Sequence, residues 1–415
     1  FGAVPDDVLT EKLAGFGTTI FAEMSALAAT TGAINLGQGF PDTDGPTEML
    51  EAAVAAIRSG VNQYPPLLGH ADLRAAIVEH QKRWYGLDVD ADTEVVVTAG
   101  ATEALAGALL GMLDPGDEVI VFEPMYDSYQ AGIALAAATP VPVLLTPGPD
   151  GRWRFDADAL RGAVTEHTKL ILLNTPHNPT GKVFDRDELE SIAEVAIEHD
   201  LIVVTDEVYE HLVFDGSEHV PLATLPGMFE RTLTISSGGK TFHTTGWKIG
   251  WMSGPAALVT AARLAKQYLT FVNGAPFQPA TAVGLRLGDD YYDSLVGDLQ
   301  TARDRLADGL ERAQRPGFGG EFRALDHREL VVPRREIRLR AIPREVFEEQ
   351  DRIGPVRRMG RDTPAGDVHM RPAIVLIRKD PADGVDALGQ ALDRLAQGAG
   401  EVIAVRHRDI AFARD

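Results

Sequence analysis

Short apolar runs alternate with amphipathic segments through the middle of this chain. The runs are rich in Val, Ile and Leu and end in Gly, Pro or polar residues: EVVVTAG (94–100), EVIVFEP (118–124), KLILLNTP (169–176), LIVVTDE (201–207) and TLTISSGG (232–239). The segments between them, such as 101–113 and 185–200, place apolar residues at helical spacing. Wholly apolar strands that alternate with helices are typical of a parallel sheet buried on both faces. The sequence therefore predicts an α/β fold, with a three-layer α/β/α large domain around a mostly parallel sheet.

The alternating pattern stops near residue 295, and the chain is longer than one hydrophobic core usually serves. It has 415 residues, whereas cores tend to split above roughly 250–300 residues. We expect a large domain over 47–294 and a smaller α+β domain built from 1–46 and 295–415. The segment 323–361 is rich in Arg within an otherwise acidic chain, and we expect it to form a solvated surface.

The composition excludes several classes of function. A formal net charge of -22 disfavours nucleic acid and anionic membranes as partners, because both require a basic surface on the protein. The chain has no cysteine, which excludes a disulfide framework, a thiolate nucleophile and a cysteine-ligated metal. No apolar stretch approaches the roughly 20 residues of a membrane helix. The chain starts at Phe1 without a secretory leader, and we expect a cytoplasmic protein with no metal site.

Unusual polar residues gather where the predicted strands end. Parallel sheets bind ligands beyond the carboxyl ends of their strands, where loops meet helix N-termini. The residues in those positions are Gly100, Ala101, Thr102, Tyr126, Asn178, Asp206, Tyr209 and Lys240. Taken alone, Asn178 would be an ordinary turn residue and Asp206 an ordinary helix cap. Their shared location is what suggests a site.

One lysine stands out in the segment SSGGKTFHTTGWKIGW (236–251). Lysine is usually a solvated cation, so Lys240 in a Gly/Ser turn directly after an apolar strand needs a reason. A nucleophilic lysine amine forms Schiff bases with carbonyls, and its usual cofactor partner is pyridoxal phosphate. That cofactor requires an anion site for its phosphate and a carboxylate beside its pyridine nitrogen. It also requires hydrogen-bond donors to its ring oxygen and a flat side chain against its ring.

The phosphate site is predicted at the turn TAGATEAL. Backbone N–H groups near Ala101 and the Thr102 hydroxyl can hold an anion at the positive end of the following helix. Ser237 and Lys248 flank the lysine loop and can complete that site. The two lysines of the loop thus divide the work, with Lys240 as the covalent residue and Lys248 as the phosphate cation.

The remaining requirements are met by residues on other strand ends. Asp206 follows the strand LIVVT and can keep the pyridine nitrogen protonated. Tyr209 and Asn178 can reach the ring oxygen, and Tyr126 offers an aromatic face. Lys240, Asp206 and Tyr209 are therefore the predicted catalytic residues.

At these residues the chain resembles the class I/II aminotransferases of pyridoxal-phosphate fold type I. The matching pieces, in the family's order and spacing, are NLGQGFP (35–41), NQYPP (62–66), TAGATEAL (98–105), EPMYDSY (123–129), NTPHNPTG (174–181), TDEVYEHLVFDG (205–216) and 236–251. The form TGWKIGW resembles the branch that holds kynurenine/glutamine aminotransferases, cysteine-conjugate β-lyases and actinobacterial N-succinyldiaminopimelate aminotransferases. FAEMSALA (21–28) is most similar to the last of these.

The resemblance implies further roles for individual residues. The backbone of Gly37 would approach the substrate carboxylate. Tyr64 would reach the phosphate in the partner's active site, which makes the expected assembly a homodimer. Lys240, once released, would act as the general base of a 1,3-proton shift. The resemblance also implies cis peptide bonds at Glu123–Pro124 and Asn178–Pro179.

The resemblance weakens after about residue 315. Family members usually carry a late Arg that grips the substrate carboxylate with two parallel hydrogen bonds. Arg371 is the candidate here because it directly precedes the apolar run AIVLI, and Arg357 and Arg358 are the alternatives.

The predicted function is transfer of an amino group from an amino acid to a 2-oxo acid, with pyridoxal phosphate as cofactor. N-succinyldiaminopimelate is one candidate substrate type. A cysteine-conjugate β-lyase would use the same cofactor site and is the first alternative. A non-catalytic regulatory homologue is the second, and intact Lys240, Asp206 and Asn178 argue against it.

Overall fold

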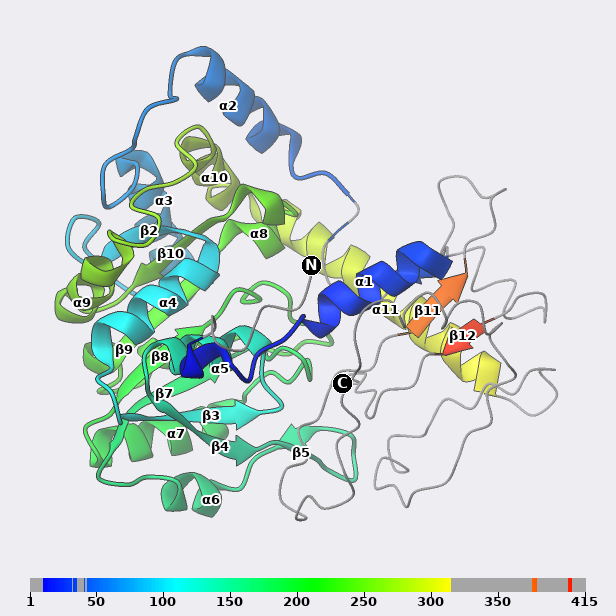
Figure 1. The fold of residues 1–415 in the computed structure, drawn as a ribbon. Coiled ribbons are helices and arrows are strands. Elements are labelled where there is room, and N and C mark those ends of the chain that lie inside the picture. The colour runs from blue at the N-terminus through cyan, green and yellow to red at the C-terminus, as the bar shows by residue number, and fades with distance from the viewer. Residues whose placement is uncertain are drawn as a thin grey trace.

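The computed structural model describes residues 10–31, 33–35, 41, 43–314, 375–378 and 402–404 (Figure 1). Its centre is a seven-stranded sheet in the order β2-β10-β9-β8-β7-β3-β4. The strands are β2 (Val95–Ala99), β3 (Glu118–Glu123), β4 (Thr139–Leu144), β7 (Thr168–Asn174), β8 (Ile202–Asp206), β9 (Thr232–Ser237) and β10 (Ile249–Ser253). Neighbours from β9 to β4 run parallel, and β10 is antiparallel to both β2 and β9. The prediction of a mostly parallel sheet is confirmed.

The described residues also form α-helices. They are α1 (Ile20–Thr31), α2 (Thr47–Arg58), α3 (Ala71–Tyr85), α4 (Gly100–Met112), α5 (Asp127–Leu135), α6 (Ala157–Gly162), α7 (Arg186–Glu198), α8 (Gly238–Thr241), α9 (Ala256–Lys266), α10 (Phe277–Leu285) and α11 (Asp289–Gln314). Short 3-10 turns are η1 (Glu11–Leu13), η2 (Leu222–Thr224), η3 (Phe229–Arg231) and η4 (Thr245–Trp247). The helices predicted over 101–113 and 185–200 correspond to α4 and α7. A capping box between Asp185 and Glu188 starts α7.

Alternate residues of the central strands serve two separate cores, which is why those strands are apolar throughout. In β7, Leu170 and Leu172 pack in the core that contains α4, α5 and α9 residues. Ile171 and Leu173 point the other way, into the core that contains α7 residues. A third cluster, around Trp251, joins β2 and β10 to α2, α3 and α10. The result is the predicted three-layer arrangement.

Two strands of the sheet were not among the predicted ones. β4 contains two prolines, which the sheet tolerates because β4 is an edge strand with no partner on its outer side among the described residues. β10 follows the lysine loop immediately and is only five residues long. Its antiparallel pairing brings Gly250 opposite Thr98 and Ser237.

A separate three-stranded sheet joins segments from both ends of the chain. β1 (Ala33–Asn35) pairs antiparallel with β11 (Val375–Arg378), which pairs antiparallel with β12 (Val402–Ala404). A small hairpin is formed by β5 (Thr146–Pro147) and β6 (Trp153–Arg154). The domain division at 294/295 stays a prediction, and that boundary falls inside α11. Among the described residues, no helix is both long and apolar enough to cross a membrane.

Candidate active site

Three neighbouring parallel strands bring the predicted site residues to one edge of the sheet. Asn174, at the end of β7, lies opposite Asp206, at the end of β8. The Asn174 amide donates to the backbone oxygen of Asp206 over 2.8 Å, and its side-chain oxygen accepts the N–H of Asn178 over 2.6 Å. Asn174 therefore ties the loop that carries Asn178 to the strand end that carries Asp206.

Asp206 is a buried carboxyl with only 4% of its surface exposed. Tyr129 donates its hydroxyl proton to Oδ2 over 2.8 Å, and the backbone N–H of Val208 donates to Oδ1 over 3.4 Å. Burial raises the pKa of Asp206 to about 6, against the hydrogen bond from Tyr129 and the positive charge of Lys240, which lower it. A buried carboxyl of this kind is suited to a cationic partner such as a protonated pyridine nitrogen.

Lys240 lies in α8, the single turn that follows β9. Burial and the nearby charge of Lys248 lower the pKa of Lys240, and the charge of Asp206 raises it. Burial is the largest of these effects, so the net shift is downward. An amine with a lowered pKa is more available as a nucleophile and as a base.

The Lys240 ammonium lies 5.5 Å from the centre of the Tyr209 ring. The Asn178 amide donates to the Tyr209 hydroxyl over 3.5 Å, and burial raises the pKa of Tyr209. The structure thus places Lys240, Asp206, Tyr209 and Asn178 together, as the sequence predicted. Their roles in catalysis stay predictions.

Lys248 lies at the N-terminus of α4. A Cβ added at Gly100 would lie 3.4 Å from the Nζ of Lys248, and one added at Gly250 would lie 2.7 Å from the backbone nitrogen of Ala101. Asn273 fixes this contact by donating to the backbone oxygen of Lys248 over 2.9 Å. A lysine amine beside the first turn of a 13-residue helix is a suitable site for an anion.

Ala101, Thr102 and Ser237, which were also predicted to hold the phosphate, lie at the ends of the neighbouring elements. Ala101 and Thr102 occupy the first turn of α4, where Ala101 is half-buried and Thr102 exposed. Ser237 ends β9 opposite Gly250. Tyr64 lies at the surface with 83% of its area exposed, and its ring contacts that of Phe271 edge-on at 5.7 Å.

Tyr126 and Tyr129 form an aromatic pair beside Asp206. Tyr126 directly precedes α5, and its half-buried ring meets that of Tyr129 at 83° with 5.6 Å between the ring centres. Burial raises the pKa of Tyr126, and the charges of Asp127 and Asp206 add to this. The role of Tyr129 was missed from the sequence, although its spacing of three from Tyr126 indicates a shared helix face.

The cis peptide bonds at Glu123–Pro124 and Asn178–Pro179 are confirmed, and a third, Thr175–Pro176, was not predicted. Gly37 and Arg371 lie outside the described residues, as do Arg357 and Arg358 and the segment 323–361. The placement of the predicted carboxylate-binding residues therefore stays a prediction.

A second group of buried ionisable residues lies near the loop that follows β8. His80, Glu210 and His211 offer side-chain atoms within 4.8 Å of one another, a spacing compatible with metal ligands. The Nε2 atoms of His80 and His211 lie 2.7 Å apart, at hydrogen-bond distance. Glu210 accepts hydrogen bonds from Tyr85 over 2.6 Å and from Ser236. Burial lowers the pKa of His80 to about 3. These contacts describe a buried hydrogen-bonded network.

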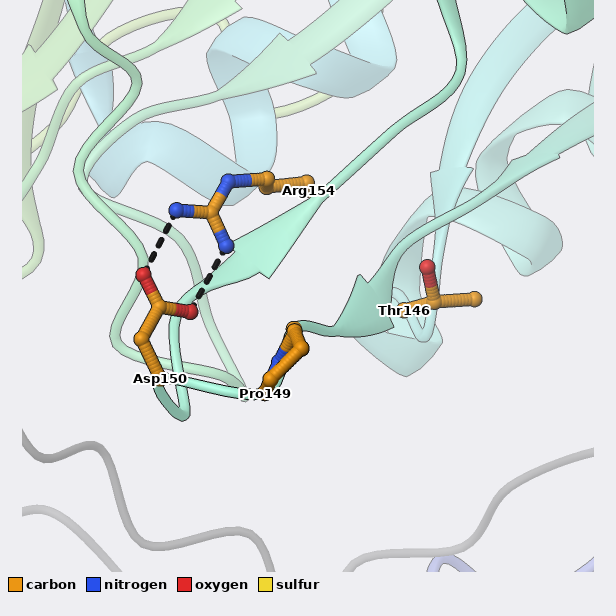
Figure 2. Close-up of a pocket in the computed structure, with 5 residues that line it drawn as sticks. Thr146, Pro149, Asp150 and Arg154 are labelled. Carbon is orange, nitrogen blue, oxygen red and sulfur yellow. Dashed lines mark hydrogen bonds and ion pairs between the residues drawn. The ribbon is translucent and has the colours of Figure 1, made fainter.

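Figure 2 shows a hollow at the β5–β6 hairpin, lined by Thr146, Gly148, Pro149, Asp150 and Arg154. Asp150 and Arg154 pair through two hydrogen bonds of 2.7 Å, so their charges neutralise each other. The hairpin follows the edge strand β4 and contributes none of the residues around Lys240. We assign it no role in the site.

Comparisons with known proteins agree with this geometry. Residues 31–333 match the family model for aminotransferase class I and II. The chain is 54% identical over 323 residues to the probable N-succinyldiaminopimelate aminotransferase DapC of Mycobacterium tuberculosis, covering 77% of this chain and 81% of that protein. It is 41% identical over 303 residues to the methionine aminotransferase of Escherichia coli, covering 73% and 78%. The solved structure of N-succinyldiaminopimelate aminotransferase from Mycobacterium tuberculosis matches with a TM-score of 0.72 at 55% identity, covering 74% of this chain and 79% of that one.

Proposed function

This chain belongs to the class I and II aminotransferases, and from that premise we propose that Lys240 is the residue that holds pyridoxal phosphate. The chain is an enzyme that moves an amino group from an amino acid to a 2-oxo acid, and its family uses this cofactor. The β-lyase and regulatory alternatives are not favoured, because the relatives named above are aminotransferases. The assignment of individual residues is the proposal.

The position of Lys240 over the Tyr209 ring and near two opposite charges carries the proposal. The negative charge of Asp206 raises its pKa and the positive charge of Lys248 lowers it, so both groups lie close enough to act on the amine. Pyridoxal phosphate has a phosphate at one end of its ring and a pyridine nitrogen at the other. A cation at the N-terminus of α4 and a buried carboxyl on β8 fit those two ends.

When bound, pyridoxal phosphate acts as an electron sink for negative charge at the substrate Cα. Asp206 would keep the pyridine nitrogen protonated, which strengthens that sink. Lys248 and the first turn of α4, with Ala101, Thr102 and Ser237, would bind the phosphate. The Lys240 amine, with a pKa lowered by burial, is suited to take the proton from Cα.

Three further residues would orient the ring. Asn178 and Tyr209 are hydrogen-bonded to each other and would donate to the ring oxygen. Tyr126, half-buried beside Tyr129, would lie against the ring face. Gly37 and Arg371 keep their predicted role in binding the substrate carboxylate.

We propose a homodimer in which Tyr64 completes the partner's phosphate site. Tyr64 and Tyr268 are more than four-fifths exposed, and Leu264, Leu269 and Phe271 are about half exposed. Large apolar side chains gathered on a surface indicate an interaction site. Sedimentation velocity should show a dimer. Tyr64→Phe should weaken cofactor binding while the protein remains a dimer. A monomer with full activity would contradict the assignment.

The proposed substrate is N-succinyldiaminopimelate, supported by the 54% identity to the probable DapC. A cytoplasmic location, expected from the acidic and cysteine-free composition, belongs to the same proposal. The decisive experiment is a panel of amino donors tested against 2-oxoglutarate and pyruvate. N-succinyldiaminopimelate should have the highest kcat/KM, with methionine and kynurenine well below it. Higher kcat/KM for either of these would overturn the substrate assignment and leave the aminotransferase activity intact.

A further inference from the structure

Lys266, the last residue of α9, is a lysine with only 1% of its surface exposed. Its Nζ donates to the backbone oxygen of Phe271 over 2.6 Å and to that of Leu67 over 3.4 Å. Burial lowers the pKa of Lys266, and the charge of Glu103 raises it. Lysine is almost never fully buried without such partners, because removing its charge from water is costly. The burial of the Lys266 side chain therefore needs a structural or functional explanation.

Glu103 connects the loop that follows Lys266 to the start of α4. It is buried in the first turn of the helix, where its Oε2 accepts the N–H of Ala99 over 2.6 Å. Its Oε1 accepts the N–H of Thr270 over 3.1 Å. One carboxylate thus connects the turn that precedes α4 to the loop that follows α9.

Close packing of α4 on α9 makes these contacts possible. The two helices lie side by side (Figure 1). A Cβ at Gly107 would lie 3.0 Å from the backbone oxygen of Ala262, and one at Gly111 would lie 2.4 Å from that of Ala261. Only glycine allows so close a backbone approach, and it brings the Lys266 stem against α4.

Phe271 has a backbone conformation that needs support. Its φ of 66° lies in the left-handed region, which is unusual for a bulky residue. Such strain persists only where surrounding contacts determine the conformation, and Lys266 bonds directly to this residue's carbonyl. The Phe271 ring in turn contacts the ring of Tyr64. Leu67, the other carbonyl partner of Lys266, lies three residues after Tyr64. Through its bonds to the backbone oxygens of Leu67 and Phe271, the buried Lys266 therefore connects the segment that carries Tyr64 to the segment that carries Phe271.

We propose that Lys266 and Glu103 are positioning residues that couple the first turn of α4 to the loop carrying Tyr64. The inference rests on the proposed function, in which the first turn of α4 binds this protomer's cofactor and Tyr64 serves the partner's. The coupling would fix the position of Tyr64, which serves the partner's site, relative to the phosphate site of its own protomer.

Hydrogen–deuterium exchange of the full-length protein, read by mass spectrometry, tests the coupling without relying on activity. The segments to compare are 64–68, 99–103 and 268–273. Lys266→Met and Glu103→Gln should each speed exchange in all three segments by about tenfold or more, the effect expected for losing a hydrogen bond to a charged group. Lys169→Met is the matched control, because Lys169 is exposed at the start of β7, and it should exchange like the wild type. Both test variants should also release added pyridoxal phosphate faster during dialysis.

Two results would overturn the proposal. Faster exchange confined to 268–273 would mean that the segments are not coupled, and a uniform increase over the whole chain would mean general destabilisation. If Lys266→Met does not fold, Lys266→Gln and Glu103→Gln give the same comparison. Lys266→Gln should lose less protection from exchange than Lys266→Met, because it keeps a hydrogen-bond donor. A wild-type protein that binds no pyridoxal phosphate would contradict the proposed function, while the exchange pattern would still decide the coupling.

Discussion

The hydroxyl of Tyr129 donates a 2.8 Å hydrogen bond to the buried carboxyl of Asp206. The two residues are far apart in sequence, on α5 and at the end of β8. The bond favours the ionised carboxylate, whereas burial favours the protonated acid. Tyr129 therefore helps to set the pH range in which Asp206 can act as a negative partner.

Tyr129→Phe should raise the pKa of Asp206 further above its ordinary value. The acidic limb of the pH profile of kcat/KM should then move to higher pH, by about one unit if the bond is worth roughly 1.5 kcal/mol. Steady-state kinetics between pH 5 and 9 would measure the shift. Tyr126→Phe is the control, because within the described residues the Tyr126 hydroxyl makes no hydrogen bond to Asp206. An unchanged acidic limb in Tyr129→Phe would contradict this role.

Asp206→Ala should reduce the rate of transamination by several orders of magnitude while leaving the fold intact. Without the carboxylate, the pyridine nitrogen loses its proton and the cofactor becomes a poor electron sink. Single-turnover rates measure the loss, and circular dichroism checks the fold. A nearly active variant would remove Asp206 from the catalytic residues.

Asp206 should also make the cofactor-free chain less stable as the pH rises. Its pKa is about 6 in the folded chain, against about 3.9 in an unfolded one. Between these values the folded state binds the extra proton, so the contribution of Asp206 to stability is fully present below about pH 4 and is lost as the pH rises through about 6. The loss approaches roughly 3 kcal/mol at neutral pH. Urea midpoints measured from pH 4 to 7 should show a smaller fall in Asp206→Asn than in the wild type, and equal slopes would argue against it.

Lys240→Ala should abolish turnover, because the variant lacks the buried amine that lies near both Asp206 and Lys248. Reduction of the holoenzyme with borohydride, followed by peptide mapping, should label Lys240. Lys248→Ala should keep that label and weaken cofactor binding instead. A label on Lys248 in the wild type would reverse the assignment of the two lysines.

Gly250→Ala should destabilise the protein and disturb the start of α4. The new Cβ would lie 2.5 Å from the carbonyl carbon of Gly100, a backbone atom that cannot move away cheaply. Overpacking of this kind typically costs about 1–3 kcal/mol. Gly246→Ala is the matched control four residues earlier, in η4, because its Cβ would meet nothing within 4 Å. Thermal unfolding of both variants gives the comparison, and equal melting temperatures would contradict the close contact.

The sequence by itself determined the layered sheet and indicated which candidate residues lie together. Strands buried on both faces must be apolar throughout, so their periodicity is visible without coordinates. Parallel strands end at a common edge, and Asp206, Asn178 and Lys240 could be grouped from their positions after those strands. The order of motifs from TAGATEAL to TGWKIGW then indicated the family.

Only the tertiary structure decided which side chains act on these residues. Tyr129 resembles any aromatic residue of an amphipathic helix, and its bond to Asp206 depends on how α5 packs over β8. Lys266 resembles the solvated lysine that commonly ends a helix, yet it is buried because Gly107 and Gly111 let α9 approach α4. Hydrogen bonds and desolvation depend on distances of a few ångströms between segments that are remote in sequence. The local pattern of apolar residues does not indicate those distances.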